Sequence, residues 1–468
     1  ESDFKFSNEN IFFFFLMLIS KTNKMKNIKY IILALSGFFL VTSCDRDLDI
    51  NPAQSITTDQ AISTPENINN ILVGTYAITG RADLFGGDTQ VYADLLGNSK
   101  YVDWYGTYAA LRHIYTKNIV SDNVYVRDTW AYAYKAIYQT NVILDNLNVV
   151  TDANDKKRIE GEAKFLRAIN YFELVRFFGK QYEAGKTNTQ LGVPIVLSSK
   201  VNFSGDLSIA RNTVEEVYAQ VIKDLTEAIT KLPSDNSYYA DIYTAKALLA
   251  RVYLQKGDYP NARTMANDVI TNSGKSLVTN FEAAFNTGEN TSEDLFAVQI
   301  TTQSGTNDLN TFYADDVYGG RGGDIAIRDE YVDLFETSDV RSDFFHYNVY
   351  GDRLSSKFKN QFGNVHVIRL AEMYLIRAEA NLALSTSVGA SPVDDVNEIR
   401  TRSNASALGS VTMADIMEER SRELGFEGFL IHDIKRTKGN VGALSWSSDR
   451  LVFPIPLREM QVNSKLVQ

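Results

Sequence analysis

The sequence of 468 residues contains very little cysteine and histidine. Its single cysteine, Cys44, cannot form an internal disulfide or supply paired thiolate ligands to zinc. The four histidines form neither an HExxH motif nor a cluster with metal-ligand spacing; they are His113, His346, His366 and His432. We therefore expect no disulfide framework, no metal site and no cofactor.

Positive charge is also scarce. Asp and Glu outnumber Lys and Arg by 58 to 47, and the formal net charge is -11 at pH 7. A nucleic-acid-binding protein needs a basic surface, so the sequence predicts no nucleic-acid partner.

Catalytic motifs are missing as well. No GxSxG nucleophile elbow occurs in the chain. Glu419 and Glu423 would be the most suggestive pair of carboxylates for a glycosidase. However, they stand four residues apart in a helical pattern that also contains Arg420 and Arg422, which is typical of a salt-bridged helix face. We therefore expect a protein that is not an enzyme.

Long apolar runs are confined to the beginning of the chain. Met25 and a basic stretch precede the apolar run from Tyr30 to Val41, which leads into Leu40-Val41-Thr42-Ser43-Cys44. This order is typical of a secretory signal, and its end resembles a bacterial lipobox. We expect residues 1–24 to be an upstream extension, residues 25–43 a lipoprotein signal peptide and Cys44 the lipidated residue. The alternative is a transmembrane anchor that buries Cys44, although the apolar run is short for a membrane span.

Amphipathic helical periodicity dominates the rest of the chain, and the helical segments occur in pairs. Trp130, Tyr134 and Ile137 have the spacing of one helix face, which predicts that Trp130 packs in the core. Thr213 and Glu216 have the spacing of a capping box at a helix start. The expected helical segments are 129–147 with 160–179, 213–233 with 244–270, 367–384 with 392–402, and 414–436. Small and large apolar residues alternate in 244–270, which resembles a tetratricopeptide helix-turn-helix unit.

Two long segments interrupt this helical pattern, near residues 80–128 and 277–365. They are rich in aromatic, glycine and turn residues, and they are longer than ordinary connections. Because binding residues usually lie on loops held by a rigid scaffold, these insertions are the expected ligand face.

The order of motifs along the chain resembles the SusD/RagB family of Bacteroidota outer-membrane lipoproteins. The motifs are EAKFLRAINYFELVRFFG, GVPIV, TAKALLARVYLQKGDYPNA, VIRLAEMYLIRAEANLAL, VNEIRTR, EERSRELGFEGFLIHDIKR and LVFPIPLREMQVN. The resemblance extends from Cys44 nearly to Gln468. It implies a mainly α fold, with a tetratricopeptide-like scaffold of helical pairs over residues 44–468 that carries the two irregular insertions.

The resemblance also implies a function. Members of this family are cell-surface lipoproteins of the outer membrane that bind oligosaccharides and deliver them to a SusC-like TonB-dependent transporter. The tetratricopeptide-like side would face the transporter, and the insertions would bind the ligand. The residues alone leave a second possibility open, a helical-repeat adaptor for proteins or a transporter lid for peptides, without glycan binding.

A sugar site needs flat aromatic faces and directional polar groups. The first insertion offers Tyr101, Trp104, Tyr105 and Tyr108, and the second offers Phe312, Tyr313, Tyr318 and Arg321. We expect these residues to contact the ligand, with Trp104 foremost. The four aromatics from 101 to 108 also have the spacing of a buried helical stripe, which is the alternative interpretation. The glycine-rich GGRGGD at 319–324 lacks the lysine and hydroxyl residue of a phosphate loop and favours a flexible loop instead.

Overall fold

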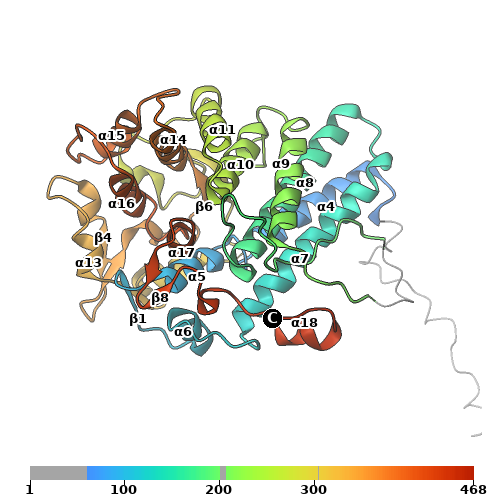
Figure 1. Ribbon diagram of the computed structural model, residues 1–468, viewed down its shortest axis with the longest axis horizontal. Coiled ribbons are helices and arrows are strands. Elements are labelled where there is room, and N and C mark those ends of the chain that lie inside the picture. Colours follow the sequence, from blue (N-terminus) through green and yellow to red (C-terminus); the bar gives the residue numbers. More distant parts are fainter. Residues whose placement is uncertain (1–60, 201–206, 304) are drawn as a thin grey trace, which may run out of the picture. The chain divides into compact units, whose positions relative to one another are not determined.

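The helices of the computed structural model form a row of neighbours. The structure describes residues 61–200, 207–303 and 305–468, so the predicted extension, signal peptide and lipidation site at Cys44 lie outside the described residues. Thr58–Gln468 forms one compact unit. Figure 1 shows the row from α4 through α7, α8, α9, α10, α11 and α14 to α15, and each helix packs against the next. The helices of the row are α4 (Pro65–Thr79), α7 (Val124–Asp145), α8 (Ala153–Phe178), α9 (Val214–Ile229), α10 (Ile242–Lys256), α11 (Tyr259–Asn272), α14 (Leu370–Leu384) and α15 (Pro392–Arg402), with α16 (Met413–Glu423) packed on α14 and α15.

Local signals in the sequence account for the ends of these helices. Thr213 and Glu216 form the predicted capping box at the start of α9. Gly257 has a φ of 73° at the end of α10, and this left-handed conformation lets α11 begin two residues later. Because Ala262 and Ala266 are small and buried, α11 can lie close to its neighbours. The predicted helical pairs are therefore confirmed.

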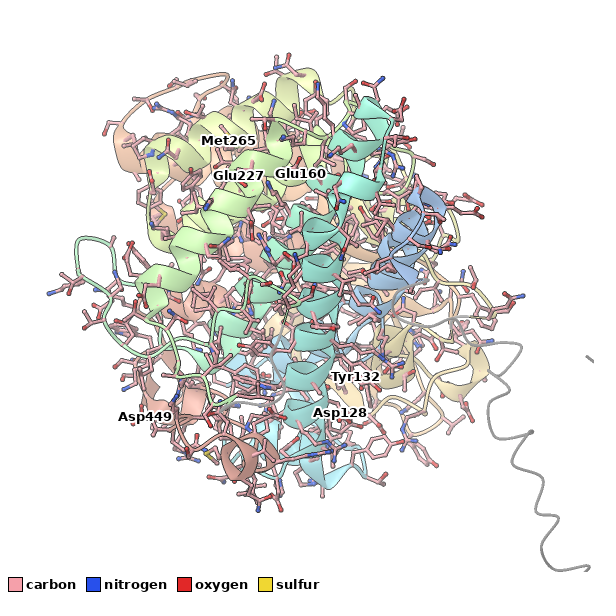
Figure 2. The ribbon with its side chains drawn as sticks, turned by 90° about the vertical axis from the view of Figure 1, so that its right-hand side faces the viewer. Asp128, Tyr132, Glu160, Glu227, Met265 and Asp449 are labelled. Atoms are coloured by element: carbon pink, nitrogen blue, oxygen red, sulfur yellow. The ribbon has the colours of Figure 1, made fainter. Side chains whose placement is uncertain are left out.

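Ion pairs join neighbouring helices on the exposed side of the row. Lys164 of α8 contacts Glu160 of α8 at 2.6 Å and Glu227 of α9 at 2.7 Å. Figure 2 shows Glu160 and Glu227 side by side on this face. The core below is aromatic. Trp130 is buried as expected, and its ring centroid lies 4.9 Å from that of Phe178. No helix in the described ranges is both long enough and apolar enough to cross a membrane.

A buried ion network fixes the C-terminal helices to the second insertion. Glu419 and Glu423 lie on α16 with no exposed side-chain surface, and Arg341 contacts both at 2.7 and 3.2 Å. Arg369 contacts Glu423 at 3.0 Å. Burial alone would raise the pKa of Glu423, but the surrounding arginines hold it well below its usual range. This carboxylate pair is thus engaged in holding the fold together.

Short helices and strands lie within the two insertions, which are otherwise irregular, as expected. The first holds α5 (Asp88–Gly97), β1 (Val102–Trp104) and α6 (Ala109–Tyr115). The second holds β2 (Asp294–Val298), α12 (Asp308–Tyr313), β3 (Ile325–Ile327), α13 (Asp329–Val332), β4 (Phe345–Tyr347), β5 (Arg353–Ser355) and β6 (Val365–Arg369). The C-terminal part adds α17 (Leu430–Arg436), β7 (Asn440–Val441), β8 (Leu444–Ser445) and α18 (Leu457–Val462).

Strand pairing closes the second insertion and joins it to the first. β2 pairs with β6, so the insertion begins and ends at the same place. β1 of the first insertion pairs antiparallel with β3 of the second, and β4 forms a hairpin with β5 beside them. In Figure 1, β1, β4 and α13 gather at the left, on the side of the molecule away from α4.

Candidate ligand-binding groove

The pairing of β1 with β3 decides which aromatic side chains face solvent. Side chains alternate between the two faces of a strand. Trp104 points inward and is only 4% exposed, whereas Tyr105, the next residue, is 57% exposed. The backbone N–H of Tyr105 donates to the carbonyl of Asp324 at 2.8 Å, which fixes its position at the end of β1. Residues 101–108 therefore form a strand and a loop, and the alternative of a helical stripe over this segment is wrong.

Tyr105 lines an open groove of about 400 Å³ together with the β4–β5 hairpin. Tyr347 of β4 also lines it and is 61% exposed. The groove residues are Asp103, Tyr105, Ala326, Ile327, Arg328, Asp329, Glu330, Tyr347, Gly351, Asp352 and Arg353. Two exposed aromatic rings thus share one groove with charged groups that can donate or accept hydrogen bonds.

The tip of the hairpin holds Tyr347 in place. Asn348 accepts from the backbone N–H groups of Tyr350 and Asp352 at 3.0 and 2.9 Å, and its amide donates to the carbonyl of Gly322 at 2.9 Å. Gly351 adopts a φ of 86°, which the turn requires and which favours glycine. These bonds tie the hairpin to the loop that precedes β3.

Arginines and carboxylates in the groove are paired with one another. Arg328 donates to both oxygens of Glu330, at 3.0 and 2.6 Å, and to Asp103 at 3.5 Å. The hydrogen bonds from Arg328 lower the pKa of Glu330 to about 2. Arg353 donates to Asp329 at 2.7 Å and to the hydroxyl of Tyr347 at 3.3 Å. Glu330 is therefore ionised at neutral pH and serves as a hydrogen-bond acceptor, not as a general acid.

Arg321 of the second insertion forms hydrogen bonds with residues of the first insertion. It donates to Asp324 at 3.0 Å, to the hydroxyl of Tyr108 at 3.0 Å and to Thr107 at 3.3 Å. Tyr108 is 40% exposed and packs edge-on against Phe312 at 6.2 Å. Within GGRGGD, Gly320 approaches the backbone so closely that a Cβ would lie 2.2 Å from the carbonyl oxygen of Ala314. Arg321 thus joins the loops after β1 and before β3.

The remaining predicted ligand contacts are distributed over several places. Trp104 packs in the core against Phe312, with ring centroids 6.2 Å apart. Tyr313 is fully buried, and its hydroxyl lies 3.4 Å from a carboxylate oxygen of Asp94. Tyr101 lines a different cavity, and its ring lies 5.5 Å from that of Tyr331. Tyr318 is exposed outside the groove, and its ring lies 5.1 Å from that of His346. Of the predicted aromatics, only Tyr105 lines the groove; Trp104 and Tyr313 offer no open face for a ligand.

Comparison with known protein families shows which family the chain belongs to. A family profile described as SusD-like, starch-binding associating with outer membrane, matches residues 47–254. A second profile, described as the SusD family, matches residues 344–451, so the two together span more than half of the chain. The chain belongs to the SusD/RagB family.

Individual SusD-like proteins extend this relationship over nearly the whole length. SusD-like protein P2 of Formosa agariphila is 25% identical over 480 residues, which cover 89% of this chain and 91% of that protein. The crystal structure of a putative sugar binding protein from Bacteroides vulgatus has a TM-score of 0.78 and 26% identity, and covers 87% of this chain and 98% of its own. A laminarin-binding SusD-like protein has a TM-score of 0.74 and 23% identity, and covers 87% and 99%. The mainly α, tetratricopeptide-like SusD fold is thereby confirmed.

Sequence reasoning missed most of the groove of this SusD-like protein. Tyr347, Arg328 and Arg353 were not among the predicted ligand contacts, although all three belong to the second insertion. Tyr347 and Arg353 lie on the short β4–β5 hairpin and Arg328 directly follows β3, and none of the three is part of a distinguishing sequence motif. Only the pairing of β1 with β3 brings them near Tyr105, which lies more than 200 residues away in the chain.

Proposed function

We propose that the protein is a cell-surface glycan-binding lipoprotein that captures oligosaccharides in the groove between its two insertions and delivers them to a SusC-like TonB-dependent transporter. Membership of the SusD/RagB family supports the general role, since its profile is described as starch-binding associating with outer membrane. The laminarin-binding structural relative supports a carbohydrate ligand.

The observation that carries the proposal is the placement of Tyr105 and Tyr347 in one open groove. A pyranose ring presents a C–H face that packs on an aromatic ring, while its hydroxyls require polar partners. Arg328, Glu330 and Asp103 supply such partners beside Tyr105. Because the groove is open at its sides, it suits a segment of a longer saccharide better than an enclosed monosaccharide.

The environments of Glu330 and Glu423 favour binding without catalysis. A glycosidase requires one carboxyl group that is protonated at its working pH and a second one opposite it. Glu330 is ionised by its bonds with Arg328, and Glu423 is enclosed by arginines in the buried network. We accordingly propose that the protein is not an enzyme.

A calorimetric glycan panel on the protein without residues 1–44 tests this function. We expect at least one oligosaccharide to bind, and Tyr105→Ala and Tyr347→Ala each to weaken it by about tenfold, because each removes one stacking face. Tyr138→Ala is the matched control, since Tyr138 is an exposed tyrosine on α7 outside the groove. A broad panel without any binding would favour the adaptor or the lid for peptides.

Delivery to a transporter requires attachment at the outer membrane. Cys44 remains the predicted lipidation site, and Asp45, Asp47 and Asp49 follow it as in lipoproteins that are exported to the cell surface. We expect Cys44→Ser to release the protein from the membrane fraction, as judged by immunoblotting of fractionated cells. A variant that stays in the membrane fraction would contradict lipid anchoring at Cys44.

A further inference from the structure

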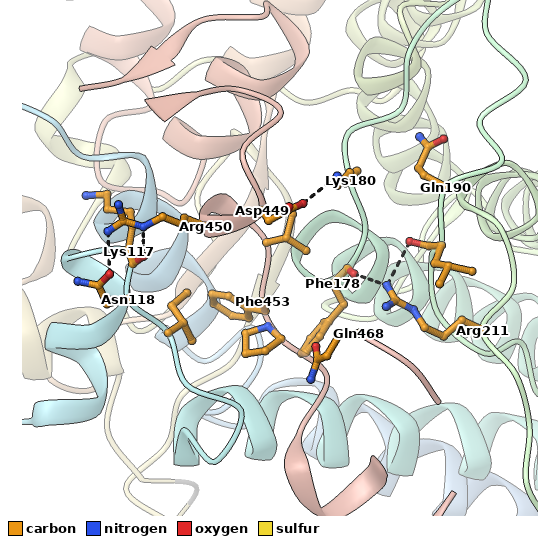
Figure 3. A pocket seen from close by; sticks show the side chains of 14 residues that line it. Lys117, Asn118, Phe178, Lys180, Gln190, Arg211, Asp449, Arg450, Phe453 and Gln468 are labelled. Carbon is orange, nitrogen blue, oxygen red and sulfur yellow. Dashed lines mark hydrogen bonds and ion pairs between the residues drawn. The ribbon is translucent and has the colours of Figure 1, made fainter. Parts of the chain in front are cut away.

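A second cavity, of about 800 Å³, lies apart from the groove and shares none of its lining residues. It is formed where the C-terminal segment meets the ends of α6 and α8 (Figure 3). Its residues are Lys117, Asn118, Ile119, Phe178, Lys180, Gln190, Leu191, Arg211, Asp449, Arg450, Val452, Phe453, Pro454 and Gln468. Four of them have cationic side chains and only Asp449 has an acidic side chain, although the chain as a whole has a net charge of -11.

Three of these cations have neutral hydrogen-bond partners. Arg211 donates to four backbone carbonyls, among them those of Phe178 at 2.8 Å and Gly192 at 2.7 Å. Arg450 donates to the carbonyls of Thr116 and Lys117 and to the side chain of Asn118. The ammonium of Lys117 donates to three carbonyls. In the described part of the chain, none of these three cations forms an ion pair with a carboxylate.

Arg450 is exposed and Arg211 is half-buried. Their bonding differs from that of several arginines whose side chains are buried. Arg167, Arg251, Arg377 and Arg436 each contact a carboxylate. The carbonyls at the ends of α5, α6 and α8 offset part of the charge in the cavity, but a helix C-terminus contributes only about half a negative charge. Burial and the charge of Arg450 also lower the pKa of Lys117 to about 8. Among the side chains that line the cavity, cationic groups therefore outnumber acidic ones.

The positions of the cations leave donors for a ligand. Figure 3 shows Arg450 and Lys117 on one side, Arg211 on the other, and the 2.8 Å ion pair of Lys180 with Asp449 between them. The Nη1 group of Arg450 has no partner among the described residues, and the Nη1 group of Arg211 makes one bond, to the carbonyl of Val467 at 3.0 Å. The walls add the apolar side chains of Ile119, Leu191, Val452 and Pro454.

From this geometry we infer that the cavity is a second binding site, which takes a sugar-sized ligand carrying a carboxylate or sulfate group. Its volume is within the range of small-molecule pockets. The anionic group supplies the negative charge that Arg211, Arg450 and Lys117 lack, and the apolar walls accommodate the carbon skeleton. The inference does not rest on the proposed role of the groove.

Calorimetric titration with glucuronate, glucose and inorganic sulfate tests the site. We expect glucuronate to bind and glucose not to bind. Competition by sulfate would indicate that the oxyanion is the recognised group. Binding of sulfate without glucuronate would assign the same oxyanion site to a free inorganic anion. Absence of binding by both anions, or equal binding of glucose and glucuronate, would overturn the inference.

Substitutions that change the charge of lining residues test whether the anion binds in this cavity. Arg450→Gln removes free donors and should weaken anion binding by about tenfold. Asp449→Asn removes the only acidic lining residue and should tighten binding by about threefold, a gain that misfolding cannot mimic. Lys156→Gln removes one positive charge at the far end of α8, about 33 Å along the helix from Phe178, and should change nothing. Equal affinities of the two cavity variants and the wild type would contradict the assignment.

Discussion

At the scale of single residues, the neighbours Trp104 and Tyr105 have opposite environments: one contributes to stability and the other to the proposed binding site. Trp104 faces the core beneath β1 and β3, and Tyr105 faces the groove. Gly106 permits this packing, because a Cβ at that position would lie 2.4 Å from the indole ring of Trp104. An aromatic pair that looks equivalent in the sequence therefore has two separate roles.

Substitutions at these two positions should separate the roles. Trp104→Ala leaves a large cavity and should lower the free energy of unfolding by about 3–5 kcal/mol. Tyr105→Ala should lower it by less than about 1 kcal/mol, since its side chain is mostly exposed, and should weaken glycan binding instead. Urea unfolding and calorimetry on both variants measure the two effects. A Trp104→Ala variant with unchanged stability would contradict the buried role of Trp104.

Asp94 should make the stability of the protein depend on pH. Its carboxylate accepts from the backbone N–H of Gly428 at 3.2 Å and lies 3.4 Å from the hydroxyl of Tyr313. Burial raises the pKa of Asp94 to about 7, although the backbone bonds and Lys357 act in the opposite direction. Between about pH 4 and pH 7 the folded protein holds a proton that the unfolded chain has lost, so this group lowers stability as the pH rises.

Asp94→Asn removes this titration. The free energy of unfolding of the variant minus that of the wild type should therefore increase from pH 4 to pH 8, by about 4 kcal/mol at most. Urea unfolding at both pH values measures the gain. Stability curves that run parallel across this range would show that Asp94 is not protonated in the fold.

At the scale of elements, the buried ion network connects α16, β6 and the loop after α16. Arg369 contacts Glu293 at 3.3 Å, Glu423 at 3.0 Å and Glu427 at 2.8 Å, and all four side chains are buried. Removal of one charge from such a network leaves its partners uncompensated in a medium of low dielectric. The network therefore holds the second insertion on the helical row.

Arg369→Met should lower the free energy of unfolding by about 3–5 kcal/mol, because three carboxylates lose a shared partner. Arg127→Met is a suitable control, since Arg127 pairs with Asp128 at an exposed position on α7 and should cost less than about 1 kcal/mol. Thermal and urea unfolding of both variants measure the difference. Similar losses from the two substitutions would contradict a stabilising network.

The paired helices from α7 onward could be predicted from the sequence, whereas the groove could not, because the two depend on interactions of different range. The capping box of Thr213 and Glu216 and the end of α10 at Gly257 depend on residues a few positions apart. The three-residue strand β1 depends on pairing with β3, and one sequence contains no signal for that pairing. Without it, the spacing of Tyr101, Trp104, Tyr105 and Tyr108 resembles a helix.

At the scale of the whole molecule, the charge is unevenly distributed. The chain has a net charge of -11, and acidic residues outnumber basic ones in the groove, but cations outnumber acids in the second cavity. Electrostatic attraction thus favours anionic ligands only at the cavity.

Salt should therefore distinguish the two sites. Binding of a neutral oligosaccharide at the groove should change little between about 50 and 500 mM NaCl, because it depends on stacking and on hydrogen bonds. Binding of glucuronate at the cavity should weaken over the same range, because salt screens the cations. Calorimetry at both salt concentrations measures this. Equal salt dependence at the two sites would contradict the distribution of roles.

The most direct measurement of the central claim is a crystal structure of the protein with the tightest-binding oligosaccharide from the glycan panel. The account predicts a sugar ring packed on Tyr105 or Tyr347, with its hydroxyls bonded to groove residues such as Arg328 and Glu330. A saccharide bound on the helical row, or in the cationic cavity with the groove empty, would contradict the claim that the two insertions together form the glycan site.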